Sequence, residues 1–188
     1  MRMLATPHVW TADDLDRLPD DGNKYEVVDG RLLVTPAPSL AHEEVLRQLR
    51  RLLELYLDRH GLGGVFPRND LKFDEHNRVD PDLSIVAVFP PIGSRTWRDV
   101  PRPMLVVEVL SRSTRTHDLV WKRELYRREG IATCWIVDHR KREVHVVRPG
   151  LVDELVTGRL SWAAPGVAEA FELDLPEFFD AVIGARER

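Results

Sequence analysis

The sequence predicts a single α+β domain, spanning residues 1–188, with a mixed central β-sheet flanked by helices. Two observations carry this prediction. A chain of 188 residues with 43% hydrophobic residues has the length and apolar content of one domain with a real core. Short apolar segments of strand length also alternate with two segments of helical periodicity, so helices are expected to pack on a sheet.

The first segment, about residues 10–36, carries signals for a short helix and a hairpin. Thr11, followed three residues later by Asp14, resembles a helix N-cap with its acidic partner. The Asp29-Gly30 dipeptide lies between two apolar runs and tolerates the positive φ angles of a type I′ turn. A β-hairpin is therefore expected around residues 29 and 30.

A long helix is expected at about residues 39–60. Ser39 is a suitable N-cap, and Gly61 is a natural stop after the last turn. The apolar positions follow the i, i+3, i+4 spacing of one helix face. They are Val45, Leu46, Leu49, Leu52, Leu53 and Tyr56.

The next segment, about residues 63–148, is expected to form the core sheet. Strand signals lie at about 64–68, 71–74, 83–88, 104–111, 133–138 and 143–147. A proline-rich irregular loop is expected at 89–103, and a helix at 117–129 ends before Gly130. The remaining segment, about 151–184, is expected to hold a strand followed by a short helix.

Composition limits the classes of function. The net charge of −4 does not favour a polyanion partner, so any nucleic-acid affinity must come from a local basic patch. A single cysteine, Cys134, excludes an intramolecular disulfide and a cysteine-based zinc cluster. With no apolar run typical of a signal peptide or a membrane span, a cytoplasmic protein without a membrane partner is expected.

Two acidic residues stand out because they adjoin or interrupt strands that are expected to be buried. Asp82 precedes the apolar run in "VDPDLSIVAV", and Glu108 lies inside "LVVEVL". Burying an isolated carboxylate costs several kcal/mol or raises its pKa until it holds a proton. A basic partner, a protonated acid or a bound metal ion would each resolve this cost.

A shared metal ion is one explanation for both residues. If the two strands are neighbours, Asp82 and Glu108 converge at one end of the sheet, where a dication with oxygen ligands such as Mg²⁺ fits. The backbone carbonyl of Val109 is a further candidate ligand. The alternatives are that Asp82 is an ordinary turn residue and that Glu108 pairs with a buried arginine.

A basic stretch follows Glu108. Residues 111–130 contain six Lys or Arg and three Asp or Glu, an excess of three positive charges. Arg112 and Arg115 lie in "SRSTRT", whose hydroxyl and N–H groups lead into a helix and are suited to binding phosphate. Lys122 on that helix can point back toward Glu108, although an ion pair with Asp118 on a solvated helix is the alternative.

Five segments in order resemble a known family over about residues 10–180. They are "YEVVDG", "PDLSIV", "VVEVLSRST", "HDLVWKRELY" and "GIATCWIVD". Together they resemble the Uma-type restriction endonuclease family of the PD-(D/E)XK nuclease superfamily. The resemblance implies a restriction-endonuclease-like fold.

The resemblance also implies a set of site residues. Asp82 and Glu108, with the Val109 carbonyl, match the metal-binding part of the superfamily pattern. Leu110 stands where the pattern has lysine, and Lys122 matches the lysine that similar family members supply from the next helix.

Two further residues match recurring family positions. Glu26 would be a third acidic ligand or would orient Lys122. His42 is an accessory candidate, for which a hydrogen bond at the helix start is the simpler interpretation.

The function implied is a metal-dependent endonuclease that hydrolyses nucleic-acid phosphodiester bonds. Mg²⁺ or Mn²⁺ would be the cofactor, DNA the expected substrate, and a homodimer the expected assembly, because cutting two strands usually needs two sites. The alternative is a catalytically inactive nuclease-like fold that serves as a nucleic-acid-binding or self-assembly module. The sequence does not distinguish DNA from RNA, or duplex from single strand.

Overall fold

A six-stranded mixed sheet forms the centre of the fold. The computed structural model describes residues 8–89, 93, 101–111 and 115–184. The strand order is β10-β9-β8-β7-β6-β3, in which β7 and β8 are parallel and the other pairs are antiparallel. The strands are β3 (Gly64–Pro67), β6 (Leu83–Val86), β7 (Leu105–Val109), β8 (Cys134–Asp138), β9 (Glu143–Val147) and β10 (Glu154–Val156). The predicted α+β class with a mixed central sheet is confirmed.

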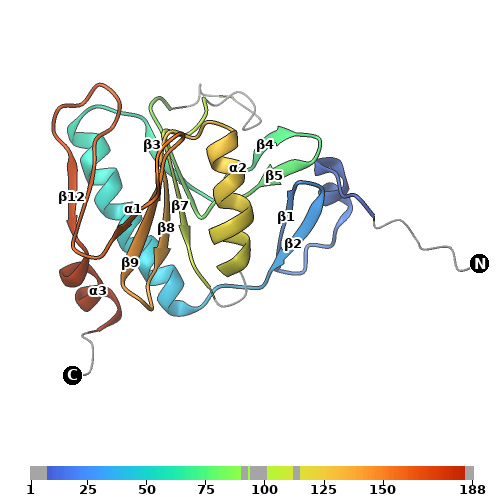
Figure 1. The fold of residues 1–188 in the computed structure, drawn as a ribbon, viewed down its shortest axis with the longest axis horizontal. Helices are drawn as coiled ribbons and strands as arrows, with labels where there is room; N and C mark the ends of the chain where they lie inside the picture. Colours follow the sequence, from blue (N-terminus) through green and yellow to red (C-terminus); the bar gives the residue numbers. More distant parts are fainter. Residues whose placement is uncertain (1–7, 90–92, 94–100, 112–114, 185–188) are drawn as a thin grey trace, which may run out of the picture.

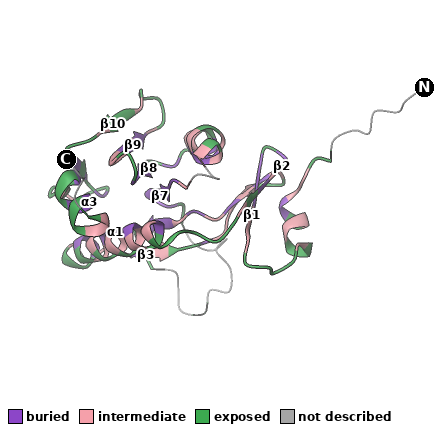
Figure 2. Cartoon of the chain, turned by 90° about the horizontal axis from the view of Figure 1, so that it is seen from below, coloured by how far each residue is buried: buried purple, intermediate pink, exposed green. Residues whose placement is uncertain are grey.

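Helices cover both faces of this sheet (Figure 1). On one face lies α1 (Leu40–Arg59), and on the other lies a helical stretch made of η3 (His117–Lys122) and α2 (Arg123–Arg128). Strands β7 and β8 are buried along their whole length between the two helical layers (Figure 2). Because side chains alternate along a strand, Val107 of β7 packs in the core on the α1 side, and Val106 packs on the α2 side.

The predicted features of α1 are present. Ser39 is the N-cap, and its hydroxyl accepts a hydrogen bond from the backbone N–H of His42 at 3.3 Å. Gly61, just beyond the helix, has a φ of 62°, the left-handed conformation that glycine adopts easily. The buried face includes Val45 and Leu49, as the apolar spacing predicts.

A second sheet of four strands lies beside the α2 layer, in the order β2-β1-β5-β4. Its strands are β1 (Lys24–Val28), β2 (Arg31–Thr35), β4 (Leu71–Asp74) and β5 (Asn77–Val79). Asp29 and Gly30 join β1 to β2 with φ angles of 49° and 71°, so the predicted hairpin turn is present. The short helix before it, η1 (Ala12–Arg17), is a 3₁₀ helix capped by Thr11 and Asp14.

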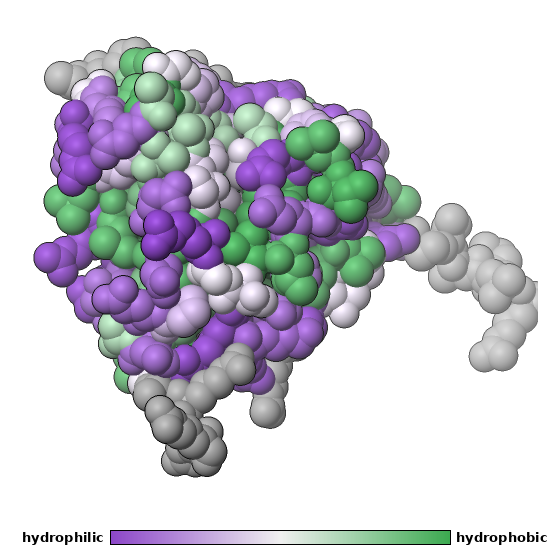
Figure 3. Space-filling view, turned by 60° about the vertical axis from the view of Figure 1, so that its left-hand side comes forward, coloured by the Kyte–Doolittle hydropathy of each residue, from purple (hydrophilic) through white to green (hydrophobic). Residues whose placement is uncertain are grey.

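The C-terminal segment packs on the other side of the molecule, against α1. It contains a two-stranded sheet of β11 (Arg159–Trp162) and β12 (Phe171–Asp174), followed by α3 (Leu175–Ile183). On the face that includes this region, hydrophilic side chains surround smaller hydrophobic areas (Figure 3). Strands β5, β10 and β11 are short and were not predicted individually.

Parts of two predicted segments lie outside the described residues. They are most of the proline-rich loop, at 90–92 and 94–100, and residues 112–114, which include Arg112. Among the described helices, none is both long and apolar enough to cross a membrane.

Candidate active site

Asp82 and Glu108 meet at one end of the main sheet. Strands β6 and β7 are antiparallel neighbours in which Leu83 lies opposite Val107. Asp82 and Glu108, one residue further along, therefore also lie opposite each other. The backbone N–H of Val109 donates to Oδ2 of Asp82 at 2.9 Å. The sheet register therefore brings together the two carboxylates that the sequence singled out, and it fixes Asp82 against the end of β7.

Lys122 compensates the charge at Glu108. Its Nζ lies 2.7 Å from Oε1 of Glu108, 2.9 Å from Oε1 of Glu26 and 3.6 Å from Oδ1 of Asp118. All four side chains are buried, and that of Lys122 is only 1% exposed. Of the three ways to tolerate a buried glutamate, the structure provides a basic partner, and this partner is the lysine that was predicted from the next helix; a raised pKa of Glu108 accompanies it.

The protonation of Glu108 is finely balanced. Burial raises the pKa of Glu108 to about 8, opposed by the Lys122 ammonium and reinforced by the nearby Asp82 carboxylate. Tyr126 donates its hydroxyl hydrogen to Oε1 at 2.6 Å, the same oxygen that Lys122 contacts. Glu108 therefore holds its proton readily and loses it when more positive charge arrives.

A second lysine, Lys24, lies beside Asp82. Its Nζ is 3.2 Å from Oδ1 of Asp82, donates to the backbone carbonyl of Asp80 at 2.9 Å, and lies 4.0 Å from Oε2 of Glu26. Sequence analysis missed this residue. The signal was available, because Lys24 and Glu26 are two residues apart on β1 and so project from the same face.

His42 holds the other oxygen of Asp82. Its Nε2 lies 3.2 Å from Oδ2, and this contact raises the pKa of His42 against the opposing effect of burial. Burial acts to raise the pKa of Asp82, but Lys24 and His42 outweigh it and hold that pKa well below its usual range. Asp82 is therefore a carboxylate at all ordinary pH values, unlike Glu108.

Glu26 is also held as a carboxylate. The ammonium groups of Lys122 and Lys24 outweigh burial and lower the pKa of Glu26. Its Oε1 also accepts the backbone N–H of Asp80 at 2.8 Å, which ties β1 to the segment before β6. Glu26 thus connects the two lysines and the strand that carries Asp82.

Lys122 comes from an unusual piece of helix. Segment η3 is a π-helix, in which the N–H of Arg123 bonds to the carbonyl of Asp118, five residues earlier. Such segments are rare and often occur at functional sites. The π-helical turn carries both Asp118 and Lys122 inward, so it is the local geometry that delivers the lysine to Glu108.

Of the two predicted phosphate ligands, the structure describes Arg115. Its guanidinium pairs with the buried carboxylate of Asp138, at the end of β8. Arg115 therefore lies on the same edge of the sheet as Glu108, with its side chain partly exposed. Arg112 lies outside the described residues.

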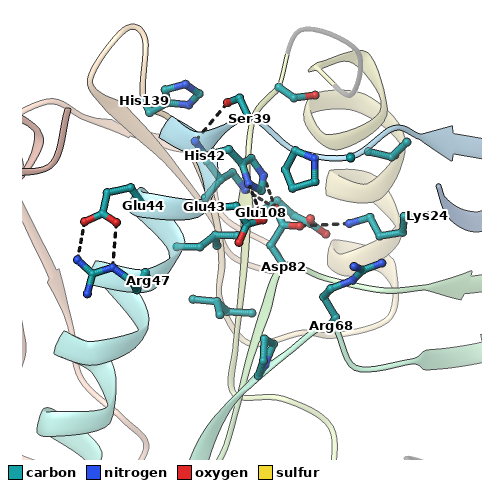
Figure 4. Close-up of a pocket in the computed structure, with 18 of the residues that line it drawn as sticks. Lys24, Ser39, His42, Glu43, Glu44, Arg47, Arg68, Asp82, Glu108 and His139 are labelled. Carbon is teal, nitrogen blue, oxygen red and sulfur yellow. Dashed lines mark hydrogen bonds and ion pairs between the residues drawn. The ribbon is translucent and has the colours of Figure 1, made fainter. Parts of the chain in front are cut away.

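A pocket of about 610 Å³ opens onto this cluster. Asp82, Glu108, Glu26 and Lys24 form part of its wall, with Lys24 and His42 on either side of Asp82 (Figure 4). Lys122 lies behind that wall. A substrate in the pocket would therefore meet the carboxylates and Lys24 first.

The donor chemistry of the cluster fits a hard dication. Mg²⁺ is commonly bound by one or two carboxylates together with water and substrate oxygens, and Asp82 and Glu108 supply two carboxylates on the pocket wall. Within the described ranges, no group of three or more His, Cys, Asp or Glu side chains is arranged to hold a metal ion.

A comparison with known protein families shows which family this chain belongs to. The model of the Uma2 family, described as "Putative restriction endonuclease", matches residues 12–176. The chain belongs to the Uma2 family. The resemblance noted in the five sequence segments is confirmed, and the matched range includes all the residues that line the pocket.

A solved structure supports the fold. The chain is similar to a crystal structure from Anabaena variabilis described as "a putative nuclease", with a TM-score of 0.73 and 18% sequence identity. The similarity covers 92% of this chain and 98% of that one. This likeness supports the restriction-endonuclease-like fold of the Uma2 chain. No curated protein matches the sequence.

Proposed function

We propose that this chain is a metal-dependent endonuclease that hydrolyses phosphodiester bonds in nucleic acid, with DNA as the expected substrate. The observation that carries the proposal is the meeting of Asp82 and Glu108 on the wall of one open pocket, where the ammonium of Lys24 contacts Asp82 and that of Lys122 contacts Glu108 from behind. Strongly shifted pKa values at a cleft are typical of catalytic sites. Membership of the Uma2 family supports the same reaction class.

Asp82 and Glu108 would hold Mg²⁺ or Mn²⁺, with the carbonyl of Val109 as a third oxygen. When bound there, such an ion polarises a phosphoryl oxygen and makes a bound water more acidic. Glu108 has to give up its proton to serve as a ligand. His42 and the N–H of Val109 keep the carboxylate of Asp82 oriented meanwhile.

The lysines supply the positive charge that phosphoryl transfer requires. We assign Lys122 as the catalytic lysine that orients the attacking water, with Glu26 holding its ammonium in place. Lys24, which lines the pocket, would stabilise negative charge developing on the phosphate. Arg112 and Arg115 would hold flanking phosphates, which add affinity without sequence information.

Cleavage of supercoiled plasmid DNA with Mg²⁺ or Mn²⁺ tests the proposal. Asp82→Asn and Glu108→Gln should abolish nicking, and Lys122→Met should slow it by about 100-fold or more. Glu154→Gln, an exposed change of the same chemical kind on β10, is the matched control and should retain full activity. If the unaltered chain cuts neither plasmid, single-stranded DNA nor RNA with either ion, the enzyme proposal fails.

A second candidate is a nuclease-like fold that binds nucleic acid, or assembles with itself, without cutting. Leu110 occupies the position of the motif lysine and is buried in the core, and Lys122 compensates Glu108 without a metal ion. Titration of Mg²⁺ by calorimetry separates a self-assembly module without a metal site, which gives no binding heat, from a metal-dependent enzyme. Salt-dependent DNA binding without cleavage would then support the second candidate.

The proposed endonuclease would act as a homodimer on duplex DNA, with one site for each strand. Sedimentation of the chain with and without a DNA duplex tests this assembly.

A further inference from the structure

The pocket extends well beyond the carboxylates. Its far wall is formed by the start of α1, at Ser39 and Leu40, and by His139 and Arg140 in the turn from β8 to β9. Figure 4 places the His139 ring beside Ser39, on the opposite side of His42 from Asp82 and Lys24. The two ends of the pocket thus present different chemistry.

The start of α1 offers unpaired backbone donors. The first N–H groups of a helix have no partner within the helix. Here Ser39 uses its hydroxyl and carbonyl to accept the N–H groups of His42 and Glu43, and those of Leu40 and Ala41 at the helix tip have no acceptor among the described residues. The macrodipole of this 20-residue helix adds a partial positive charge at the same place.

Independent evidence for a ligand comes from buried polar atoms that lack a partner. The His139 residue is 6% exposed, and its Nδ1 has no hydrogen-bond partner in the described part of the chain. Thr35 Oγ1 is likewise a buried atom without a hydrogen-bond partner among the described residues, and both residues line this pocket. Buried polar groups are normally paired, so two such atoms in one pocket indicate a polar ligand.

Arg140 supplies the charge. The N–H of Arg140 donates to Oδ1 of Asp138 at 3.2 Å, which fixes the turn, while its side chain is exposed at the pocket rim. Its guanidinium makes no ion pair with another described residue, whereas Arg47 pairs with Glu44 on α1. One acid, Glu43, lines the pocket near the start of α1; its side chain is 58% exposed, and its Oε1 lies 3.8 Å from Nδ1 of His42.

We propose that this end of the pocket is a phosphate-binding subsite, in which the helix tip of α1, the His139 imidazole and the Arg140 guanidinium hold a phosphate group. The inference rests on the proposed function, because the phosphate would belong to the nucleic acid cut at Asp82 and Glu108. The subsite itself needs no divalent ion. It would set how the strand lies across the carboxylates.

Titration of the full, ¹⁵N-labelled chain in EDTA tests the subsite directly. Inorganic phosphate and dimethyl phosphate are the probes, representing a strand end and an internal diester. We expect saturable shifts of the Leu40 and Ala41 amides and of the His139 ring, with affinity at least 5-fold weaker in His139→Ala and in Arg140→Gln. Arg159→Gln, which removes one exposed charge from β11, is the control and should bind as the unaltered chain does.

The outcomes separate the sources of the phosphate. Binding of dimethyl phosphate assigns the subsite to an internal phosphate, and binding of inorganic phosphate alone assigns it to a strand end; both support the subsite. Absence of saturable shifts, or equal weakening by Arg140→Gln and Arg159→Gln, overturns it. Plasmid nicking without these shifts would contradict the subsite but not the proposed nuclease. Shifts without any nicking would contradict the proposed nuclease but not the subsite.

Discussion

At Glu108, burial and charge compensation act in opposite directions, and the site depends on their balance. Burial favours the protonated acid, while the Lys122 ammonium favours the carboxylate. The sequence could identify Glu108 as anomalous, because a lone acid in a valine-rich strand is costly. It could not choose among the three remedies, because the choice depends on which side chain of the next helix arrives within about 3 Å.

Metal binding should release a proton from Glu108. Because burial raises its pKa to about 8, the folded chain below that pH carries a proton there, which an incoming dication must displace. Affinity for Mg²⁺ should therefore rise as the pH increases toward 8 and level off above it. Calorimetry at pH 7 in two buffers of different ionisation enthalpy measures the released proton. Identical heats in the two buffers would contradict the expectation.

Removing the compensating lysine should destabilise the fold. Lys122→Met leaves Glu108 and Glu26 buried without their main cation, at an expected cost of about 3–5 kcal/mol in the free energy of unfolding. Urea denaturation at pH 7 measures it. Lys24→Met is the comparison and should cost less, since the Lys24 side chain is 12% exposed and lies nearer to water. Equal and small losses in both variants would argue against a buried ionic cluster.

At the scale of elements, prediction from sequence succeeded where a local rule applies. The cap at Ser39, the stop at Gly61 and the Asp29-Gly30 turn all depend on residues close together in the chain, and the structure contains each one. Short strands such as β5 and β10 gave no usable pattern, because three residues do not define a period.

The start of α1 allows stability and anion binding to be separated. Ser39→Ala removes the side-chain cap and should lower the free energy of unfolding by about 1 kcal/mol. Ser39→Asp keeps a capping oxygen, so it should preserve stability, but its charge should weaken phosphate binding at the helix tip. Urea denaturation and the phosphate titration measure the two effects. If Ser39→Asp binds phosphate as tightly as the unaltered chain, the helix tip is not part of the subsite.

Across the whole molecule, the site joins segments that are far apart in sequence. Lys24 and Asp82 are separated by 58 residues, and Thr35 at the end of β2 is separated from His139 by 104 residues. The family resemblance predicted Glu26 and Lys122 as site residues, but it could not predict Lys24 or the residues of the far wall of the pocket. Those residues are recognisable only when the sheet brings them together.

The fold should be independent of metal. Because the Lys122 ammonium already lies against Glu108 and Glu26, EDTA should leave the thermal midpoint of the chain unchanged. Added Mg²⁺ should raise it, by the equivalent of about 2.7 kcal/mol at 100 times its dissociation constant. Differential scanning calorimetry measures both effects. Unfolding on chelation would mean that the ion, and not the lysine, holds the cluster together.

The π-helical turn gives this arrangement a consequence for control. In the proposed endonuclease, the ammonium that already lies against Glu108 would compete with an arriving divalent ion. Such an enzyme would stay inactive until the free ion concentration crossed a threshold. The ion concentration at this threshold would depend on how strongly the π-helical turn holds Lys122 against Glu108.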